Sequence, residues 1–278
     1  MSRERSDRCP GALRPWPADD GLLARLRLIG GRVSSAALRS LLDVAEAYGD
    51  GRIHLTSRSN LQLRALPSAA GALPIEVVAA IEATGLLPSR AHDLVRNVMV
   101  SPQTGLAGGR ADLRRVAGAL DAALLAQPRL ATLPGRFLFV LDDGRGDLLD
   151  RSCDLGLVAV DGGTTQLRVG DGFGPTVRLG AAADELARLA LLFLDSRGTG
   201  PTAPWHVREL AEPLAAVSDP DPRLPQSSSP LPYGVVPGGI HVEIPDGLLD
   251  RALVDALTTA PSLIVTPWRG VLVPQEDR

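Results

Sequence analysis

Arginine and amide side chains recur at a spacing of two residues along two segments near the amino terminus. Arg25 and Arg27 alternate with leucines, so on a strand both guanidiniums would lie on one face. A second set with the same spacing consists of Thr56, Arg58, Asn60 and Gln62. Because a guanidinium can hold a carboxylate through two parallel hydrogen bonds, this pattern favours a ligand that carries many carboxylates. A solvated strand face is the alternative interpretation.

Another polar pair, Arg96 and Asn97, precedes a compact turn at 101–105. A Gly-rich segment at 108–112 then leads into a predicted helix. Such an entry could hold an anion at the helix N-terminus, and a plain helix-capping turn explains the same spacing. Both interpretations are open from the residues alone.

The first two sets of side chains fall on a unit that occurs twice in the chain. A short apolar strand, an amphipathic helix at about 34–48 and an alternating strand at 53–63 form the first copy. The same order returns with a helix at about 248–259 and a strand at 263–273. A duplicated half-domain favours pairing about a pseudo-two-fold axis. We expect the strand at 53–63 to line a cleft at that axis.

The residues between the copies alternate between helical and strand patterns, which predicts an α+β domain. The predicted helices are 73–83, 113–126 and 183–194, and the predicted strands are 136–141, 155–160 and 165–169. A Gly-rich stretch at 169–174 is interpreted as a hairpin or surface loop, because no helix follows it directly. Asp142, Asp143 and Asp147 indicate a β-turn, since the ligand order of an EF-hand is absent. Proline and serine at 218–232 predict a linker.

The composition limits the class of protein. The chain has 278 residues, a net charge of −3 and a pI of about 5.8, and every one of its 29 basic residues is arginine. No basic stripe with interleaved aromatic residues occurs, so the sequence is not typical of a nucleic-acid binder. The longest apolar run, 186–194, is too short to cross a membrane, and the charged start at 1–8 leads into no apolar signal segment. We expect a cytoplasmic protein without a membrane partner.

Sequence motifs assign neither catalytic residues nor metal ligands. HExxH, GxSxG and P-loop motifs are absent, and the histidines are scattered along the chain. The two cysteines, Cys9 and Cys153, are too few to hold a four-cysteine iron-sulfur cluster.

A string of short motifs resembles the nitrite and sulfite reductase superfamily. The motifs are Cys9-Pro10-Gly11-Ala12, Asp20-Gly21-Leu22-Leu23-Ala24-Arg25, Thr56-Ser57-Arg58-Ser59-Asn60-Leu61-Gln62 and Arg96-Asn97-Val98. Within that superfamily, the first two motifs are most similar to precorrin-3B synthases. The resemblance implies an α+β fold with two ferredoxin-like half-domains related by pseudo-two-fold symmetry plus a central nitrite/sulfite-reductase-like domain. The half-domains would be 1–72 and 233–278, the central domain 73–217 and the linker 218–232.

The resemblance also implies a tetrapyrrole site. Arg25 and Arg96 match family arginines that face the anion or substrate, and Arg58 with Asn60 matches the strand that supports the macrocycle. Arg136 falls where the reductases have the first of two pocket lysines. The residues expected to bind a precorrin or sirohaem are therefore Arg25, Arg27, Thr56, Arg58, Asn60, Gln62, Arg96, Asn97 and Arg136.

Three functions are compatible with this resemblance. The cobalamin branch implies an oxidoreductase, a monooxygenase that hydroxylates a precorrin and forms a lactone with the help of an iron-sulfur cluster. The family's cluster cysteines have no counterparts in this sequence, so a non-catalytic tetrapyrrole-binding module that works with a separate electron-donor or cluster-bearing protein is the second hypothesis. A sirohaem-type nitrite or sulfite reductase is the third, and the absence of lysine departs from that pattern.

Overall fold

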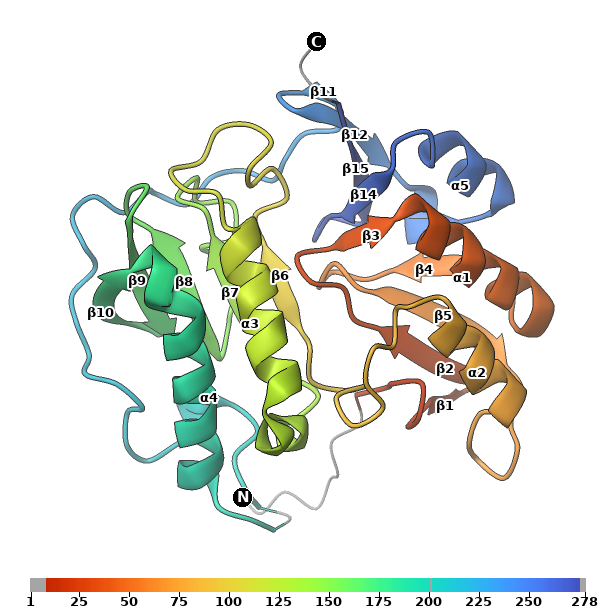
Figure 1. The fold of residues 1–278 in the computed structure, drawn as a ribbon, viewed down its shortest axis with the longest axis horizontal. Helices are drawn as coiled ribbons and strands as arrows, with labels where there is room; N and C mark the ends of the chain where they lie inside the picture. Colours follow the sequence, from red (N-terminus) through yellow and green to blue (C-terminus); the bar gives the residue numbers. More distant parts are fainter. Residues whose placement is uncertain (1–8, 201, 276–278) are drawn as a thin grey trace. The chain divides into compact units, whose positions relative to one another are not determined.

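The computed structural model describes residues 9–200 and 202–275. The outer bounds of the two predicted half-domains, residues 1 and 278, lie outside the described residues. The chain forms two compact units. The ferredoxin-like unit comprises Cys9–Leu94 and Leu231–Arg278, and the central unit comprises Val95–Pro230 (Figure 1). Among the described residues, no helix is both long and apolar enough to cross a membrane.

The ferredoxin-like unit contains the same succession of elements twice. The first copy consists of β1 (Trp16–Ala18), β2 (Gly21–Leu26), β3 (Arg32–Ser34), α1 (Ser35–Tyr48), β4 (Ile53–Leu55) and β5 (Leu61–Leu66). The second copy consists of β11 (Gly234–Val236), β12 (Gly239–Glu243), β13 (Leu248–Leu249), α5 (Arg251–Leu257), β14 (Ser262–Val265) and β15 (Gly270–Pro274). An additional helix, α2 (Ile75–Ala83), follows the first copy.

The two copies exchange their third strands. One sheet has the order β1-β2-β5-β4-β13 and the other has the order β11-β12-β15-β14-β3. Leu248 of β13 lies opposite His54 of β4, and Val33 of β3 lies opposite Leu263 of β14. Each sheet is therefore completed by a strand from the other copy, which confirms the expected α+β fold with two half-domains related by pseudo-two-fold symmetry.

One hydrophobic core serves both copies. It includes Leu38 and Leu41 of α1 together with Val254 and Leu257 of α5. Helix α1 lies between α2 and α5 on one face of the unit (Figure 1). A copy that stood alone could not bury its helix face as fully. Because the burial of each such side chain contributes about 1.5–3 kcal/mol, the shared core stabilises both copies.

Both helices begin at a side-chain cap. The Ser34 hydroxyl accepts the Ala37 N–H at 3.1 Å, and the Asp250 carboxylate accepts the Leu253 N–H at 2.9 Å. These caps satisfy amide groups that have no partner within the helix. The second helix is shorter than the predicted 248–259, because Leu248 and Leu249 are used in the exchanged strand.

The two predicted alternating strands are wrong as continuous elements. The segment 53–63 reverses between β4 and β5, and 263–273 reverses between β14 and β15, so each forms an antiparallel hairpin. The expected common face for Thr56, Arg58, Asn60 and Gln62 is therefore not formed. The apolar–polar alternation continues through the turn residues, so the period of two does not reveal the reversal.

Matching hydrogen bonds close the two hairpin turns. The Thr56 N–H donates to the Asn60 carbonyl at 3.0 Å, and the Thr56 hydroxyl accepts the Asn60 N–H at 3.1 Å. Thr266 and Gly270 repeat both bonds, at 2.9 and 3.2 Å. Ser59 has a φ of 56°, which interrupts the extended backbone. The threonine hydroxyl and the left-handed residue together produce the reversal.

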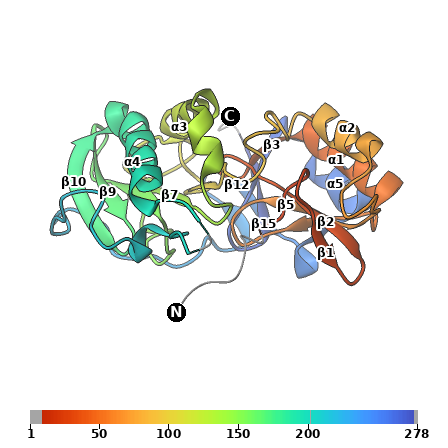
Figure 2. The same cartoon turned by 90° about the horizontal axis from the view of Figure 1, so that it is seen from below.

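The central unit is a mixed sheet covered by two helices. Its elements are β6 (Val98–Val100), α3 (Arg114–Ala126), β7 (Phe139–Asp142), β8 (Leu155–Ala159), β9 (Thr164–Val169), β10 (Gly172–Arg178) and α4 (Ala182–Arg197). The sheet order is β10-β9-β8-β7-β6, with parallel pairing from β6 to β8 and antiparallel pairing beyond. Helices α3 and α4 pack side by side over it (Figure 2). The hairpin prediction at 169–174 is confirmed, because β9 and β10 pair across that turn.

Short 3-10 helices occupy several connections. They are Pro128–Thr132, Leu179–Ala181, Val207–Glu209 and Pro245–Gly247.

The boundaries of the compact units differ from the predicted ones. Helix α2 contacts α1, so the first part of the ferredoxin-like unit extends to Leu94 rather than to residue 72. The Pro- and Ser-rich segment at 218–230 lies on the central unit. Its backbone bonds include Ser218 N to Phe173 O at 3.0 Å and Ser228 N to Gly146 O at 3.0 Å. An irregular segment is thus held by specific hydrogen bonds.

Candidate functional site

Arg25, on the ferredoxin-like unit, has a guanidinium whose hydrogen-bonding groups are only partly used. It lies opposite Gln62 in the β2–β5 pair, and its Nη2 donates to Gln62 Oε1 at 3.0 Å. Its Nε is buried without a hydrogen-bond partner, and no carboxylate among the described residues pairs with it. Burial lowers the pKa of Arg25, the Cys9 thiolate would raise it, and the charge of Arg58 lowers it further. A half-buried guanidinium therefore lacks an anion at this position.

Arg27 has a different environment from Arg25, although the two are separated by one residue. Strand β2 ends at Leu26, and the Arg27 side chain is buried. Its Nη1 donates to the Asp93 carbonyl at 2.7 Å and its Nη2 donates to the Pro10 carbonyl at 3.1 Å. Through these hydrogen bonds, Arg27 connects the end of β2 to Pro10, which precedes β1, and to Asp93, which follows α2.

The turn after β4 brings Arg58 toward Arg25. Within this turn Asn60 is buried, and its Oδ1 accepts the Leu28 N–H at 3.0 Å. The polar groups of Thr56 and Asn60 therefore shape the turn, whereas Arg58 stands at its tip and acts electrostatically on Arg25. Of the residues predicted on this unit, Arg25, Arg58 and Gln62 are the ones that the fold brings to one place.

The second copy has a closed counterpart of this position. His241 pairs with Leu272 as Arg25 pairs with Gln62, and it is fully buried. Its Nδ1 donates to the Leu231 carbonyl at 3.1 Å and its Nε2 lies 3.0 Å from the Thr266 hydroxyl. The Tyr233 ring lies 4.6 Å from the imidazole. The position equivalent to Arg25 is thus occupied by a core histidine whose two ring nitrogens have partners, so the pseudo-symmetry of the backbone does not extend to this side chain.

The predicted residues of the central unit differ in how they are used. Arg96 forms a bidentate ion pair with Asp121, at 2.6 and 2.9 Å. Asn97 is buried, and its amide donates to the Gly135 carbonyl at 2.9 Å. Arg136 is exposed, and its guanidinium lies 5.4 Å from the centre of the Trp205 ring. Since Asp121 neutralises Arg96, Arg136 is the more accessible of the two guanidiniums.

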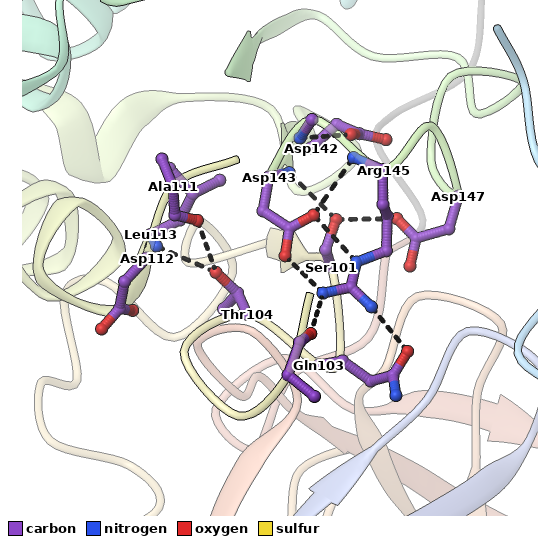
Figure 3. A network of polar contacts seen from close by, with 12 residues as sticks. Ser101, Gln103, Thr104, Ala111, Asp112, Leu113, Asp142, Asp143, Arg145 and Asp147 are labelled. Atoms are coloured by element: carbon purple, nitrogen blue, oxygen red, sulfur yellow. Dashed lines mark hydrogen bonds and ion pairs between the residues drawn. The ribbon is translucent and has the colours of Figure 1, made fainter. Parts of the chain in front are cut away.

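A buried carboxylate network at the carboxyl ends of β6 and β7 was not predicted as a unit (Figure 3). Asp142 accepts the N–H groups of residues 144, 146 and 148 at 2.9–3.0 Å. Asp143 pairs with Arg145 at 2.8 Å, and the Ser101 hydroxyl donates to Asp147 at 2.7 Å. Burial, followed by the repulsion of Asp142, raises the pKa of Asp147 to about 7. Asp142 therefore holds the loop's own backbone, as the turn interpretation requires, while Asp143 and Asp147 bind the side chains of Arg145 and Ser101.

The Gly-rich entry to α3 forms a capping turn. The Thr104 hydroxyl accepts the Leu113 N–H at 2.9 Å, and the Asp112 carboxylate accepts the Arg114 N–H at 3.0 Å (Figure 3). Two of the amide groups that an anion would need are therefore already used. The structure supports the capping interpretation of this segment over an anion site.

The cysteines do not fit an iron-sulfur cluster. Cys9 lies in the ferredoxin-like unit and Cys153 in the central unit. Burial raises the pKa of the Cys153 thiol to about 11, whereas a cluster ligand must be a thiolate. Across residues 9–200 and 202–275, no group of three or more His, Cys, Asp or Glu side chains is placed to hold a metal ion. The described residues therefore do not fit the cluster that the family resemblance implies.

Comparison with known proteins identifies the first copy. Residues 17–70 match the family described as the Nitrite/Sulfite reductase ferredoxin-like half domain. A precorrin-3B synthase from Sinorhizobium sp is 38% identical over 65 residues, which are 23% of this chain and 14% of that protein. A ferredoxin–nitrite reductase from Synechococcus elongatus is 33% identical over 129 residues, which are 44% of this chain and 25% of that protein.

A solved structure extends the likeness to the whole fold. The NirA protein of Mycobacterium tuberculosis superposes with a TM-score of 0.69 at 19% identity, over 99% of this chain and 58% of that one. The chain thus matches less than two thirds of the length of each of these proteins. Residues 17–70 thus form a nitrite/sulfite reductase ferredoxin-like half-domain, and the chain is similar to members of that superfamily in sequence over part of its length and in fold over nearly all of it.

Proposed function

We propose that this protein binds a carboxylate-rich tetrapyrrole and is a precorrin-3B synthase-like oxidoreductase of cobalamin biosynthesis. The observation that supports this proposal most directly is Arg25, whose buried Nε has no partner and whose charge has no carboxylate among the described residues. The similarity to a precorrin-3B synthase supports the choice of the ring.

The energetics of Arg25 favour an acidic ligand. A buried cation without a counter-ion loses hydration without gaining an equivalent interaction. A ligand carboxylate would accept hydrogen bonds from its Nε and would offset the repulsion between Arg25 and Arg58. Gln62 would keep the guanidinium in place through its existing bond at 3.0 Å. Precorrins and sirohaem carry acetate and propionate groups, so each could supply this carboxylate.

The ring and the protein would contribute different parts of the chemistry. A bound tetrapyrrole would supply the oxidisable carbon framework or, as sirohaem, the redox-active iron. The residues of this chain would bind its acid groups and fix its orientation. The described cysteines and carboxylates do not form a metal centre, so the electrons would come from a redox centre that these residues do not supply.

Titration of the purified protein with precorrin-3A and with sirohaem tests the proposal. We expect saturable binding, which the change in absorbance of the ring measures. Arg25→Ala should weaken the affinity by about 10–100-fold, because it removes one or two charge-assisted hydrogen bonds. Arg64→Ala is the matched control, because Arg64 lies on β5 and pairs with Asp20 at the surface. The proposal fails if neither compound binds, or if both substitutions weaken binding equally.

A sirohaem-type nitrite or sulfite reductase is the second candidate. The longer of the two sequence matches, to a ferredoxin–nitrite reductase, favours it. The same titration separates the candidates, since preference for sirohaem over precorrin-3A supports a reductase. Binding of either ring without turnover in the presence of a reduced ferredoxin or of oxygen would instead support the non-catalytic binding module.

A further inference from the structure

A row of polar side chains extends from Arg25 across three neighbouring strands of the ferredoxin-like unit. Gln62 of β5 lies opposite Arg25 of β2 on one side and opposite His54 of β4 on the other. Because directly paired residues share a face of a sheet, the three side chains point to the same side. Leu26 and Leu61, which follow Arg25 and precede Gln62 in the chain, belong to the hydrophobic core. The row therefore lies on the sheet face that is turned away from that core.

Asp50 fixes the hydrogen-bonding state of His54. His54 Nε2 lies 2.6 Å from Asp50 Oδ2, and Asp50 Oδ1 accepts the Arg52 N–H at 3.1 Å. Because an ionised carboxylate only accepts hydrogen bonds, Nε2 must carry the proton, and Nδ1 of the neutral ring presents a lone pair. Nδ1 has no hydrogen-bond partner within the described part of the chain and is not one of its buried unpaired atoms. The second nitrogen of His54 is therefore open to a ligand.

The other charged groups near His54 already have partners. Asp20, in the turn between β1 and β2, interacts electrostatically with His54, and Arg64 of β5 does so with Asp50. Asp20 and Arg64 form a bidentate ion pair with each other at 2.9 and 3.0 Å. Leu248 of β13, which lies opposite His54, carries no charge. The charge of the imidazole is therefore set mainly by Asp50 and by what binds at Nδ1.

Arg25 and His54 are placed to bind two acid groups of one ligand. Adjacent strands are about 4.8 Å apart, so the Cα atoms of two residues separated by one strand are about 10 Å apart. The Arg25 side chain is directed toward β5, since its Nη2 donates to Gln62 Oε1 at 3.0 Å, and this shortens the gap between the two binding groups. A tetrapyrrole with acetate and propionate groups carries acid groups side by side. A carboxylate bound at Arg25 thus brings a second acid group close to His54.

We propose that His54 is a second ligand contact beside Arg25, that it takes up a proton when the ligand binds, and that Asp50 is its positioning residue. The carboxylates of Asp50 and of the ligand then flank the imidazole, and their negative charges favour the imidazolium form. One N–H bond forms at Nδ1 with a proton from the solvent, and no other covalent bond changes. The carboxylate-rich ligand rests on the proposed function, whereas the orientation of the imidazole does not.

Long-range ¹H–¹⁵N correlation spectra of the unsubstituted protein test the proposal without any variant. At a pH at which the ring is neutral in the free protein, His54 should carry its proton on Nε2. Saturation with uroporphyrin, which has an acetate and a propionate on every pyrrole, should give the signature of a doubly protonated ring. His241 should keep its protonation state, because both of its ring nitrogens have partners. A proton on Nδ1 in the free protein, or a ring that stays neutral in the complex, overturns the proposal.

Calorimetric titration with uroporphyrin in buffers of different ionisation enthalpy counts the protons taken up at the same pH. We expect about one proton per bound ring. His54→Gln should abolish this uptake and weaken the affinity by about 10-fold, and Asp50→Asn should reduce the uptake, because the imidazolium loses a flanking carboxylate. His206→Gln is the matched control, since His206 also pairs with an aspartate, Asp154, but lies in the central unit. Equal proton uptake by His54→Gln and the unsubstituted protein contradicts the assignment.

The outcomes distinguish this inference from the proposed function. If uroporphyrin binds in an Arg25-dependent manner without proton uptake, the role of His54 is overturned and tetrapyrrole binding stands. If His206→Gln abolishes the uptake as fully as His54→Gln does, the assignment to His54 is also overturned. If uroporphyrin, precorrin-3A and sirohaem all fail to bind, the proposed function and the ligand contact of His54 are overturned together.

Discussion

Arg25 and Gln62 face each other across the β2–β5 pair, and the amide oxygen of Gln62 accepts the Arg25 Nη2–H at 3.0 Å. A neutral amide orients the guanidinium but does not compensate its charge. The same position of the second copy holds His241, all of whose ring nitrogens have partners. The two half-domains therefore share a backbone design and differ in what they offer to a ligand.

Replacing Arg25 with methionine should stabilise the protein. The substitution removes a half-buried cation without a counter-ion and keeps an unbranched side chain of similar length, so we expect the free energy of unfolding to rise by about 1 kcal/mol. Urea denaturation measures this change. A marked loss of stability would mean that Arg25 serves the fold rather than a ligand.

Replacing Gly31 with alanine should disrupt the exchange of strands. Gly31 has a φ of 72°, and its added methyl group would lie 2.0 Å from the Val265 carbonyl oxygen. We expect destabilisation by about 2–4 kcal/mol from backbone strain and steric overlap together. Gly51→Ala is the control, because Gly51 has a φ of 75° with no atom within 4 Å of the added carbon. Thermal unfolding should separate the two variants, and equal effects would contradict the steric argument.

Replacing Asp147 with asparagine should change how stability depends on pH. The pKa of Asp147 rises from 3.8 to about 7 on folding, so between these values the folded protein holds a proton that the unfolded chain has released. The stability of the unsubstituted protein should therefore fall as the pH rises from about 4 to about 7 and should not fall further through this group above that range. Asparagine keeps an acceptor for the Ser101 hydroxyl and removes the ionisation.

Urea denaturation at pH 5 and pH 8 checks this prediction. Asp147→Asn should gain stability relative to the unsubstituted protein at the higher pH, by an amount on the order of 1 to a few kcal/mol. The exposed Asp171→Asn serves as the control for a general charge effect. A difference between Asp147→Asn and the unsubstituted protein that is the same at both pH values would contradict the assignment.

Replacing Arg96 with alanine should destabilise the central unit. The substitution leaves the Asp121 carboxylate without its bidentate partner, and both side chains are largely buried. We expect a loss of about 2–4 kcal/mol. The exposed pair of Arg129 and Asp195 provides the comparison, and Arg129→Ala should cost about 0.5 kcal/mol or less. If Arg96→Ala leaves stability unchanged but abolishes tetrapyrrole binding, Arg96 belongs to the ligand site despite its ion pair.

The local elements were largely predictable from the sequence. The helical period and the side-chain caps locate α1, and the glycines at 170 and 172 mark the β9–β10 turn. The duplicated order of elements indicated two half-domains, because the order depends on local periodicity. The hairpin turns were missed, since alternation at spacing two continues through Thr56 to Asn60 while the Thr56 hydroxyl and Ser59 reverse the chain.

The use of each polar side chain was decided by the tertiary structure. Sequence spacing treats Arg25 and Arg27 as equivalent, but β2 ends at Leu26, and the Arg27 guanidinium is directed to the carbonyls of Pro10 and Asp93. Arg96 is likewise paired by Asp121 from a helix that is distant in sequence. The exchange of β3 and β13 depends on which strand edges meet. The sequence by itself determined which groups could bind acids, and only the packing of distant segments decided which of those groups the protein uses internally.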